Sequence, residues 1–309
     1  MKFWKKIVIV LLVLFVSAEL YLRLYWGFCD SVLMMANKNY EYIAQPNQDR
    51  FRFRKHIKYN SFSMRSEEVD TTSSIILGLG DSILNGGVSV DQDSIATTLL
   101  SDTLTKINHS KVQVLNISAG SWGPDNCFAY LKEKGDFKAQ MIFLVVSSHD
   151  AYDNMDFMPV IDKVRRYEST QYKLATWELI DKYMIPMLTD NFPSEQFGVI
   201  KHGLQFNNGF ENLYQYCKSK NIPFIIYLNP DRNEISSGKY NVQGDEIISF
   251  CKSNSIECIQ GLNHTVISDY RGVIHLNASG QKKMSSLLLN GIIEKNNQYH
   301  FFKLTNESE

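Results

Sequence analysis

The sequence predicts an α/β domain in which helices cover both faces of a parallel five-stranded sheet, an αβα sandwich of three layers, with a transmembrane helix ahead of it. Short aliphatic runs alternate with amphipathic segments, and parallel strands need such helical crossovers. The aliphatic runs are continuous, which is typical of strands buried on both faces. A chain of 309 residues with 44% hydrophobic and 21% charged residues can form one sizeable domain plus an extension.

The N-terminus predicts a membrane anchor at residues 1–29. Residues 3–25 are mostly apolar, and about 20 such residues span a bilayer. Three lysines precede this stretch, Lys2, Lys5 and Lys6, and they place that end in the cytoplasm and the rest of the chain outside it. Residues 17–19 provide only a weak cleavage site, so we expect the segment to be retained, although a cleaved signal peptide is the alternative.

The remaining chain divides into three parts. Residues 30–70 are polar and irregular in pattern, and we expect a membrane-proximal stalk there. Residues 71–296 form the main domain, and 297–309 a polar tail. Residues 153–200 within the domain lack a strand pattern and are rich in aromatic residues and methionine, which predicts a helical insertion. Its apolar side chains form either a helix core or a lid over the site.

The elements of the main domain follow in order. Strands are expected at 75–80, 112–117, 141–146, 223–228 and 256–259. Helices are expected at 94–107, 124–131, 204–218, 241–253 and 279–294, with Asp93 and Ser279 as N-caps of the first and last. The first three strands all end in small or polar residues. Because carboxyl ends of parallel strands meet at one edge of a sheet, these tips are expected to share a crevice.

Four stretches carry chemistry, and they are Gly80-Asp81-Ser82, residues 116–120, residues 147–150 and residues 269–277. Together, in this order, they resemble the sequence blocks of the SGNH (GDSL-type) hydrolase superfamily. Residues 59–65 also resemble the lead-in of its membrane-anchored bacterial members. The resemblance implies a flavodoxin-like sheet order and a single-pass protein of the bacterial inner membrane, with its catalytic domain in the periplasm.

The resemblance also implies a serine nucleophile at Ser82 and a general base at His275. Backbone N–H groups of Ser82 and Gly120 would form the oxyanion hole. The family's third donor is an asparagine side chain, and His149 stands in its place; an imidazole N–H can donate the same hydrogen bond.

Two positions near these residues leave alternatives open. The family's aspartate three residues before the histidine is absent here. Asp269 would then orient His275, or a backbone carbonyl would serve and leave a Ser-His dyad. Asp150 would orient His149 or a neighbouring loop, or simply cap a helix.

The resemblance implies a serine esterase, most simply one that removes O-acetyl groups from envelope or extracellular polysaccharide. Alternatives are an O-acetyltransferase that uses the same acyl-enzyme, and a carbohydrate-binding module that has lost catalysis. The expected partners are an acylated carbohydrate, the membrane and polysaccharide-assembly proteins. A net charge of -1 gives no basis for nucleic-acid binding, and no metal, nucleotide or other cofactor motif is found.

The five cysteines are an odd number and show no metal-site spacing. Cys127, Cys217 and Cys251 lie in apolar contexts that favour buried free thiols. Cys251 and Cys258 are the only pair considered for a disulfide, and Cys29 follows a phenylalanine, which disfavours lipidation.

Overall fold

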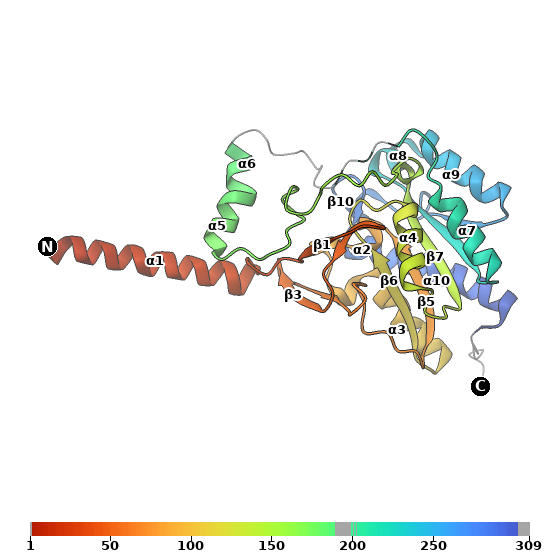
Figure 1. Ribbon diagram of the computed structural model, residues 1–309, viewed down its shortest axis with the longest axis horizontal. Helices are drawn as coiled ribbons and strands as arrows, with labels where there is room; N and C mark the ends of the chain where they lie inside the picture. The colour runs from red at the N-terminus through yellow and green to blue at the C-terminus, as the bar shows by residue number, and fades with distance from the viewer. Residues whose placement is uncertain (1, 189–198, 200, 202, 302–309) are drawn as a thin grey trace.

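The computed structural model describes residues 2–188, 199, 201 and 203–301, and its centre is a five-stranded sheet (Figure 1). The strands are β5 (Ser74–Gly80), β6 (Val112–Ser118), β7 (Met141–Ser147), β8 (Phe224–Asn229) and β9 (Glu257–Gln260). Every pairing is parallel, in the order β6-β5-β7-β8-β9. This confirms the predicted sheet and has the flavodoxin-like order.

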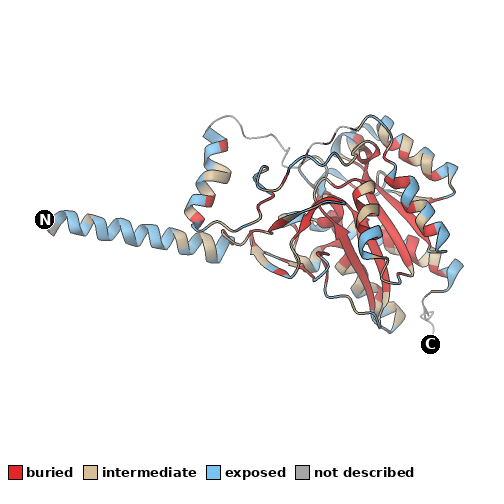
Figure 2. Ribbon diagram, viewed as in Figure 1, coloured by how far each residue is buried: buried red, intermediate tan, exposed pale blue. Residues whose placement is uncertain are grey.

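Helices cover both faces of the sheet, as predicted. One face packs against α4 (Pro124–Lys134), α7 (Gly209–Ser219) and α9 (Val242–Ser253). The other packs against α2 (Ser82–Asn85), α3 (Ala96–Asn108) and α10 (Ala278–Tyr299). A short helix, α8 (Arg232–Ser237), follows β8. Figure 2 shows the strands buried between these layers, which explains their continuous aliphatic sequences.

Three helix starts differ from the prediction. Asp93 lies in a 3-10 turn, Gln92–Ser94, and α3 begins after it. The N-cap of α10 is Asn277, whose side chain accepts hydrogen bonds from the N–H groups of Ser279 and Gly280. Helix α7 begins at Gly209 rather than at 204. Asn277, two residues before Ser279, thus takes the capping role in α10. At the start of α3 no local side chain caps the helix, and the Ala96 N–H donates to Gln281 Oε1 at 2.9 Å.

The predicted irregular stalk is wrong, because residues 30–70 contain two antiparallel hairpins. They are β1 (Met34–Asn37) with β2 (Glu41–Ala44), and β3 (Gln48–Arg52) with β4 (Lys55–Tyr59). Tyr40, Tyr42, Ile43 and Ile57 are buried in the core shared with α4 and α7. The aromatic residues that made this stretch look irregular are the side chains that attach it to the domain.

The insertion is only partly helical. After an irregular stretch, it forms α5 (Ala175–Leu179), a π-helical segment (Ile180–Met184) and α6 (Ile185–Leu188). Most of its large side chains do not form a helix core, since Phe157, Met158, Trp177, Met184 and Met187 are exposed, whereas Tyr167 is buried in the main core. The predicted insertion from 189 to 198, and residue 200, lie outside the described residues.

Helix α1 (Lys2–Trp26) projects from the domain (Figure 1). Within Phe3–Trp26, an 18-residue window has a mean hydropathy of 2.4 and is not buried, so the helix is long and apolar enough to cross a membrane. At the other end, α10 extends to Tyr299, so the predicted tail begins in a helix.

All five cysteines are free, and the Cys251 and Cys258 thiols form a hydrogen bond instead of the disulfide considered above. Cys127, Cys217 and Cys251 are buried, as predicted.

Candidate active site

Ser82 lies at the tight junction between β5 and α2. The Asp81 side chain accepts the Ile83 N–H at 2.8 Å, which starts the helix directly after the strand. A Cβ on Gly80 would lie 3.0 Å from both Leu84 Cβ and the Val145 carbonyl oxygen. Only glycine therefore lets α2 pack this closely on the strand, and the turn holds Ser82 at the carboxyl edge of the sheet.

Two buried side chains hold α2 and the loop that follows it. The Arg65 guanidinium donates to the Gly87 and Val90 carbonyls at 2.7 Å, and also to Asn85 O. Gln281 of α10 donates to the Ile83 carbonyl at 2.7 Å. Sequence analysis did not predict these supports. A fully buried arginine whose guanidinium binds backbone carbonyls has no signal in the sequence beyond its place in the 59–65 block.

His275 stands beside the serine on a short hairpin. Strands β10 (Tyr270–Arg271) and β11 (His275–Leu276) pair antiparallel, with Arg271 opposite His275. The Nε2 atom of His275 lies 3.0 Å from Ser82 Oγ. This is the distance required for a base that removes the serine proton.

The surroundings of His275 disfavour its charged form. Desolvation, then the positive charges of Arg166, His149 and Arg271, lower its pKa to about 4. One side of the ring still meets solvent. The imidazole is therefore neutral at pH 7 and can accept a proton, but the imidazolium that forms during catalysis receives no support from a nearby carboxylate.

Asp269 does not orient His275. Its carboxylate accepts hydrogen bonds from Lys283 Nζ at 2.6 Å, Ser279 Oγ at 2.8 Å and the Val266 N–H at 2.9 Å. Burial would raise the pKa of Asp269, but these hydrogen bonds outweigh burial and lower it. In the described part of the chain, Ser82 is the sole hydrogen-bond partner of the His275 ring. The expected role of Asp269 fails because its hairpin turns the carboxylate toward α10.

Gly120 lies on the loop after β6, where its carbonyl is fixed by two tyrosines. Tyr42 Oη and Tyr167 Oη donate to Gly120 O at 2.9 and 3.2 Å. A Cβ on Gly120 would lie 2.8 Å from Tyr167 Oη, so this position requires glycine. Within the described residues, neither the Gly120 nor the Ser82 N–H donates an internal hydrogen bond. Both remain available to an oxyanion.

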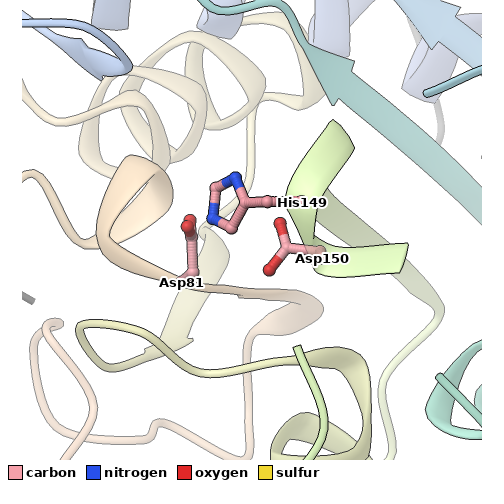
Figure 3. Close-up of side chains that lie close together, drawn as sticks. All are labelled: Asp81, His149 and Asp150. Carbon is pink, nitrogen blue, oxygen red and sulfur yellow. The ribbon is translucent and has the colours of Figure 1, made fainter. Parts of the chain in front are cut away.

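His149 lies above a pair of buried acids (Figure 3). One of its ring nitrogens is on the Asp81 side, and its Nε2 is 3.7 Å from Asp153 Oδ2. Burial and the charge of Asp150 raise the pKa of Asp81 to about 8, while burial and Asp153 raise that of Asp150. At neutral pH this pair therefore holds at least one proton.

Asp81, His149 and Asp150 are also the described residues best placed to hold a cation, with ligand atoms within 4.8 Å of one another. Each carboxylate already accepts a backbone amide, Ile83 N for Asp81 and Ser147 N for Asp150. Asp150 therefore fixes the turn that carries His149, which is one of the two roles considered for it. These hydrogen bonds give each of the two carboxylates a structural role that does not involve a metal.

A polar pocket of about 290 Å³ opens beside His149. It is lined by His149, Tyr152, Asp153, Lys201, Gly203 and Gln243. Hydroxyl, amide and charged side chains of this kind bind polar groups, and the rings of His149 and Tyr152 add apolar surface.

No protein-family model and no curated protein matches this sequence. Among solved structures, the chain is similar to the lipase/acylhydrolase from Enterococcus faecalis, with 12% identity, a TM-score of 0.43 and coverage of 75% of this chain and 99% of that one. The psychrotrophic esterase EstA from Pseudoalteromonas sp. shows 12% identity and a TM-score of 0.42, covering 73% and 100% of the two chains.

A member of the lipolytic protein G-D-S-L family from Veillonella parvula shows 13% identity and a TM-score of 0.41, with 71% and 97% coverage. Similarity at this level does not establish what the chain does, so the function has to be inferred from the side chains of the site. They place a serine and a neutral histidine in contact at the carboxyl edge of a parallel sheet, beside two free backbone donors.

Proposed function

We propose that this protein is a serine ester hydrolase of the SGNH type. The observation that carries the proposal is the 3.0 Å contact between His275 Nε2 and Ser82 Oγ. Ser82 and His275 belong to two sequence blocks and lie 193 residues apart in the chain, and the fold brings them together. A binding module without catalysis would have no need for this contact.

The reaction follows from the positions of these groups. His275 removes the Ser82 proton as Oγ attacks the ester carbonyl, and the oxyanion forms beside the Ser82 and Gly120 N–H groups. His275 then gives the proton to the departing alcohol, leaving an acyl-serine. Water activated by the same histidine attacks the acyl-serine, which releases the acid and restores Ser82. Because no carboxylate binds the imidazolium, we expect slower turnover than in a full triad.

For the substrate, we propose an acyl ester on a carbohydrate, most simply O-acetyl on envelope polysaccharide. The polar pocket beside His149 supports this choice, because sugar hydroxyls hydrogen-bond to such side chains whereas an acyl chain would need an apolar channel. His149 lines this pocket and also lies near His275, whose pKa its charge lowers, so we propose that the sugar binds on the His149 side of the catalytic pair.

We further propose that α1 is retained as a single-pass anchor of a bacterial inner membrane, with the domain on the periplasmic side. Its length and hydropathy support a span. The lysines near its start support a cytoplasmic N-terminus.

The test is acetate release by the full chain in detergent, from an aryl acetate and from an acetylated polysaccharide. Ser82→Ala is compared with Ser286→Ala, which removes an exposed serine of α10. We expect activity that disappears only in the Ser82 variant. A folded protein with no activity above the Ser82→Ala background on either substrate would refute the proposal. Adding a sugar acceptor then shows whether the acyl group can also be transferred.

A further inference from the structure

We propose that α5, the π-helical segment and α6, residues 175–188 and hereafter the surface helix, lie along the outer face of the membrane crossed by α1. Their apolar side chains would enter the boundary between lipid headgroups and acyl chains. The inference rests on the proposed role of α1 as an anchor and is independent of the ester chemistry.

The surface helix has the reverse polarity of a helix on a water-soluble domain. Its charged residues face the protein, where the fully buried Glu178 binds Arg52 Nη2 at 2.7 Å and Lys182 Nζ at 3.0 Å. Its outer side chains are apolar, and Trp177 is 53% exposed and Leu188 80% exposed. A helix that packs on a soluble protein turns its apolar face inward. The reversed arrangement indicates an apolar medium outside.

The outer apolar side chains form one continuous face. Trp177, Ile180, Met184 and Leu188 recur three or four residues apart, as one side of a helix requires, and the other members flank this row. The full set is Trp177, Ile180, Met184, Ile185, Met187 and Leu188. Exposed apolar residues that occur singly are ordinary, whereas a contiguous face of this kind marks a binding surface. A tryptophan among aliphatic residues is typical of helices that lie in the membrane interface.

The surface helix begins on α1 itself. The Glu19 carboxylate accepts the Ala175 N–H at 2.7 Å and the Thr176 N–H at 2.9 Å, so a residue of α1 supplies the N-terminal cap of α5. Arg23 donates to the Lys173 carbonyl at 2.6 Å. These bonds fix the start of the surface helix at the level of residues 19–23 of α1.

That level matches the expected membrane boundary. Tyr21, Tyr25 and Trp26 are exposed on the same end of α1, and aromatic rings of this kind gather where a span leaves the hydrocarbon. In Figure 1, α5 and α6 run across the direction of α1. If α1 crosses the bilayer, the surface helix therefore runs along its plane, at the depth of the aromatic rings.

Lipid is favoured over a protein partner because the apolar face is continuous with the exposed surface of α1. A second attachment would also stop the domain from rotating about α1. Figure 1 places α2 and β10 on the half of the domain nearer α1, so the Ser82 edge would be held toward the bilayer. Esters displayed close to the membrane surface would then be the accessible ones.

The test is fluorescence quenching of the full chain in phosphatidylcholine vesicles, with or without acyl chains brominated near the headgroup. Trp4→Phe with Trp26→Phe leaves Trp177 and the buried Trp122. We expect brominated lipid to quench part of the emission, and Trp177→Phe to remove the quenchable part. As a matched control, Val242→Trp is added to this Trp177→Phe background. Val242 is 74% exposed on α9, and a tryptophan there should not be quenched.

A second variant keeps Trp26 and replaces Trp177, so that Trp26 reports on α1. Quenching of Trp26 without quenching of Trp177 would overturn the surface-helix proposal and leave the anchor in place. Absence of quenching at both positions would overturn both. Ser82→Ala should show the same Trp177 quenching as the parent, so a failure of the esterase proposal leaves this measurement unaffected.

Discussion

The two halves of the candidate active site are held in very different ways. Ser82 begins α2, and the carbonyls of α2 and of the loop after it are bound by Arg65 and Gln281, both buried. His275 lies on a hairpin with two-residue strands, and its ring bonds only to Ser82 among the described residues. The nucleophile is thus positioned by the core, whereas the base is positioned by a surface ribbon and lacks a carboxylate. In the proposed reaction, the serine is therefore the firmly held partner and the histidine the loosely held one.

The largest effect is expected from removing the base. His275→Gln should lower kcat for an aryl acetate by on the order of 10⁴-fold, because a Ser hydroxyl without a base is a poor nucleophile. His264→Gln, an exposed histidine on the same side of β10, is the control and should be unchanged. A loss below about tenfold would show that His275 is not the base.

The rigid half is tested by Arg65→Met. It leaves the buried Asn85 and Val90 carbonyls and the Gly87 carbonyl without the Arg65 donors, and we expect a loss of roughly 3 kcal/mol in unfolding free energy, together with reduced kcat. Chemical denaturation followed by circular dichroism measures the first quantity. The control is Arg54→Met, an exposed arginine on the β3–β4 turn. Equal stability of the two variants would contradict the proposed support of the serine turn.

The electrostatic half is tested by pH. Because the pKa of His275 is lowered, kcat/KM should stay constant while the solution is acidified through the pH range in which histidines ordinarily titrate. It should fall only at lower pH. Arg271→Gln removes a positive charge opposite His275, so the pKa rises and the acid limb moves to higher pH, by up to about one unit. A limb that moves to lower pH, or stays in place, would show that Arg271 does not act on His275.

The smallest effect is expected from Asp269→Asn. In a full triad the equivalent change costs about 10⁴-fold in kcat. Here we expect less than about threefold, with a modest loss of stability from the Lys283 ion pair. Lys283→Met should reproduce the stability loss. A large fall in kcat for Asp269→Asn, without a similar fall for Lys283→Met, would show that Asp269 acts with His275 as the third member of a triad.

The sequence predicted the parts of this molecule that depend on local pattern. The five strands, the serine at the tip of β5 and the histidine before α10 follow from aliphatic runs and short motifs. What it could not predict depends on contacts between distant residues. Asp269 looked able to reach His275 by spacing, but Ser279 and Lys283, 10 and 14 residues later near the start of α10, bind it instead.

The predictions for residues 30–70 and for the insertion were wrong for a related reason. Tyr40 and Tyr42 are buried only because α4 and the Gly120 loop cover them. Glu178 is buried only because Arg52, 126 residues earlier, pairs with it. Neither environment is written in the local sequence, and both required the tertiary fold.

The most direct test of the Ser82–His275 pair is covalent labelling. The full chain is incubated with an alkyl fluorophosphonate, which reacts with activated serines, and the modified peptide is identified by mass spectrometry. We predict modification of Ser82, strongly slowed in His275→Gln and unaffected in Asp269→Asn. Modification of another serine, or equal labelling of Ser82 in the parent and His275→Gln, would contradict the catalytic pair.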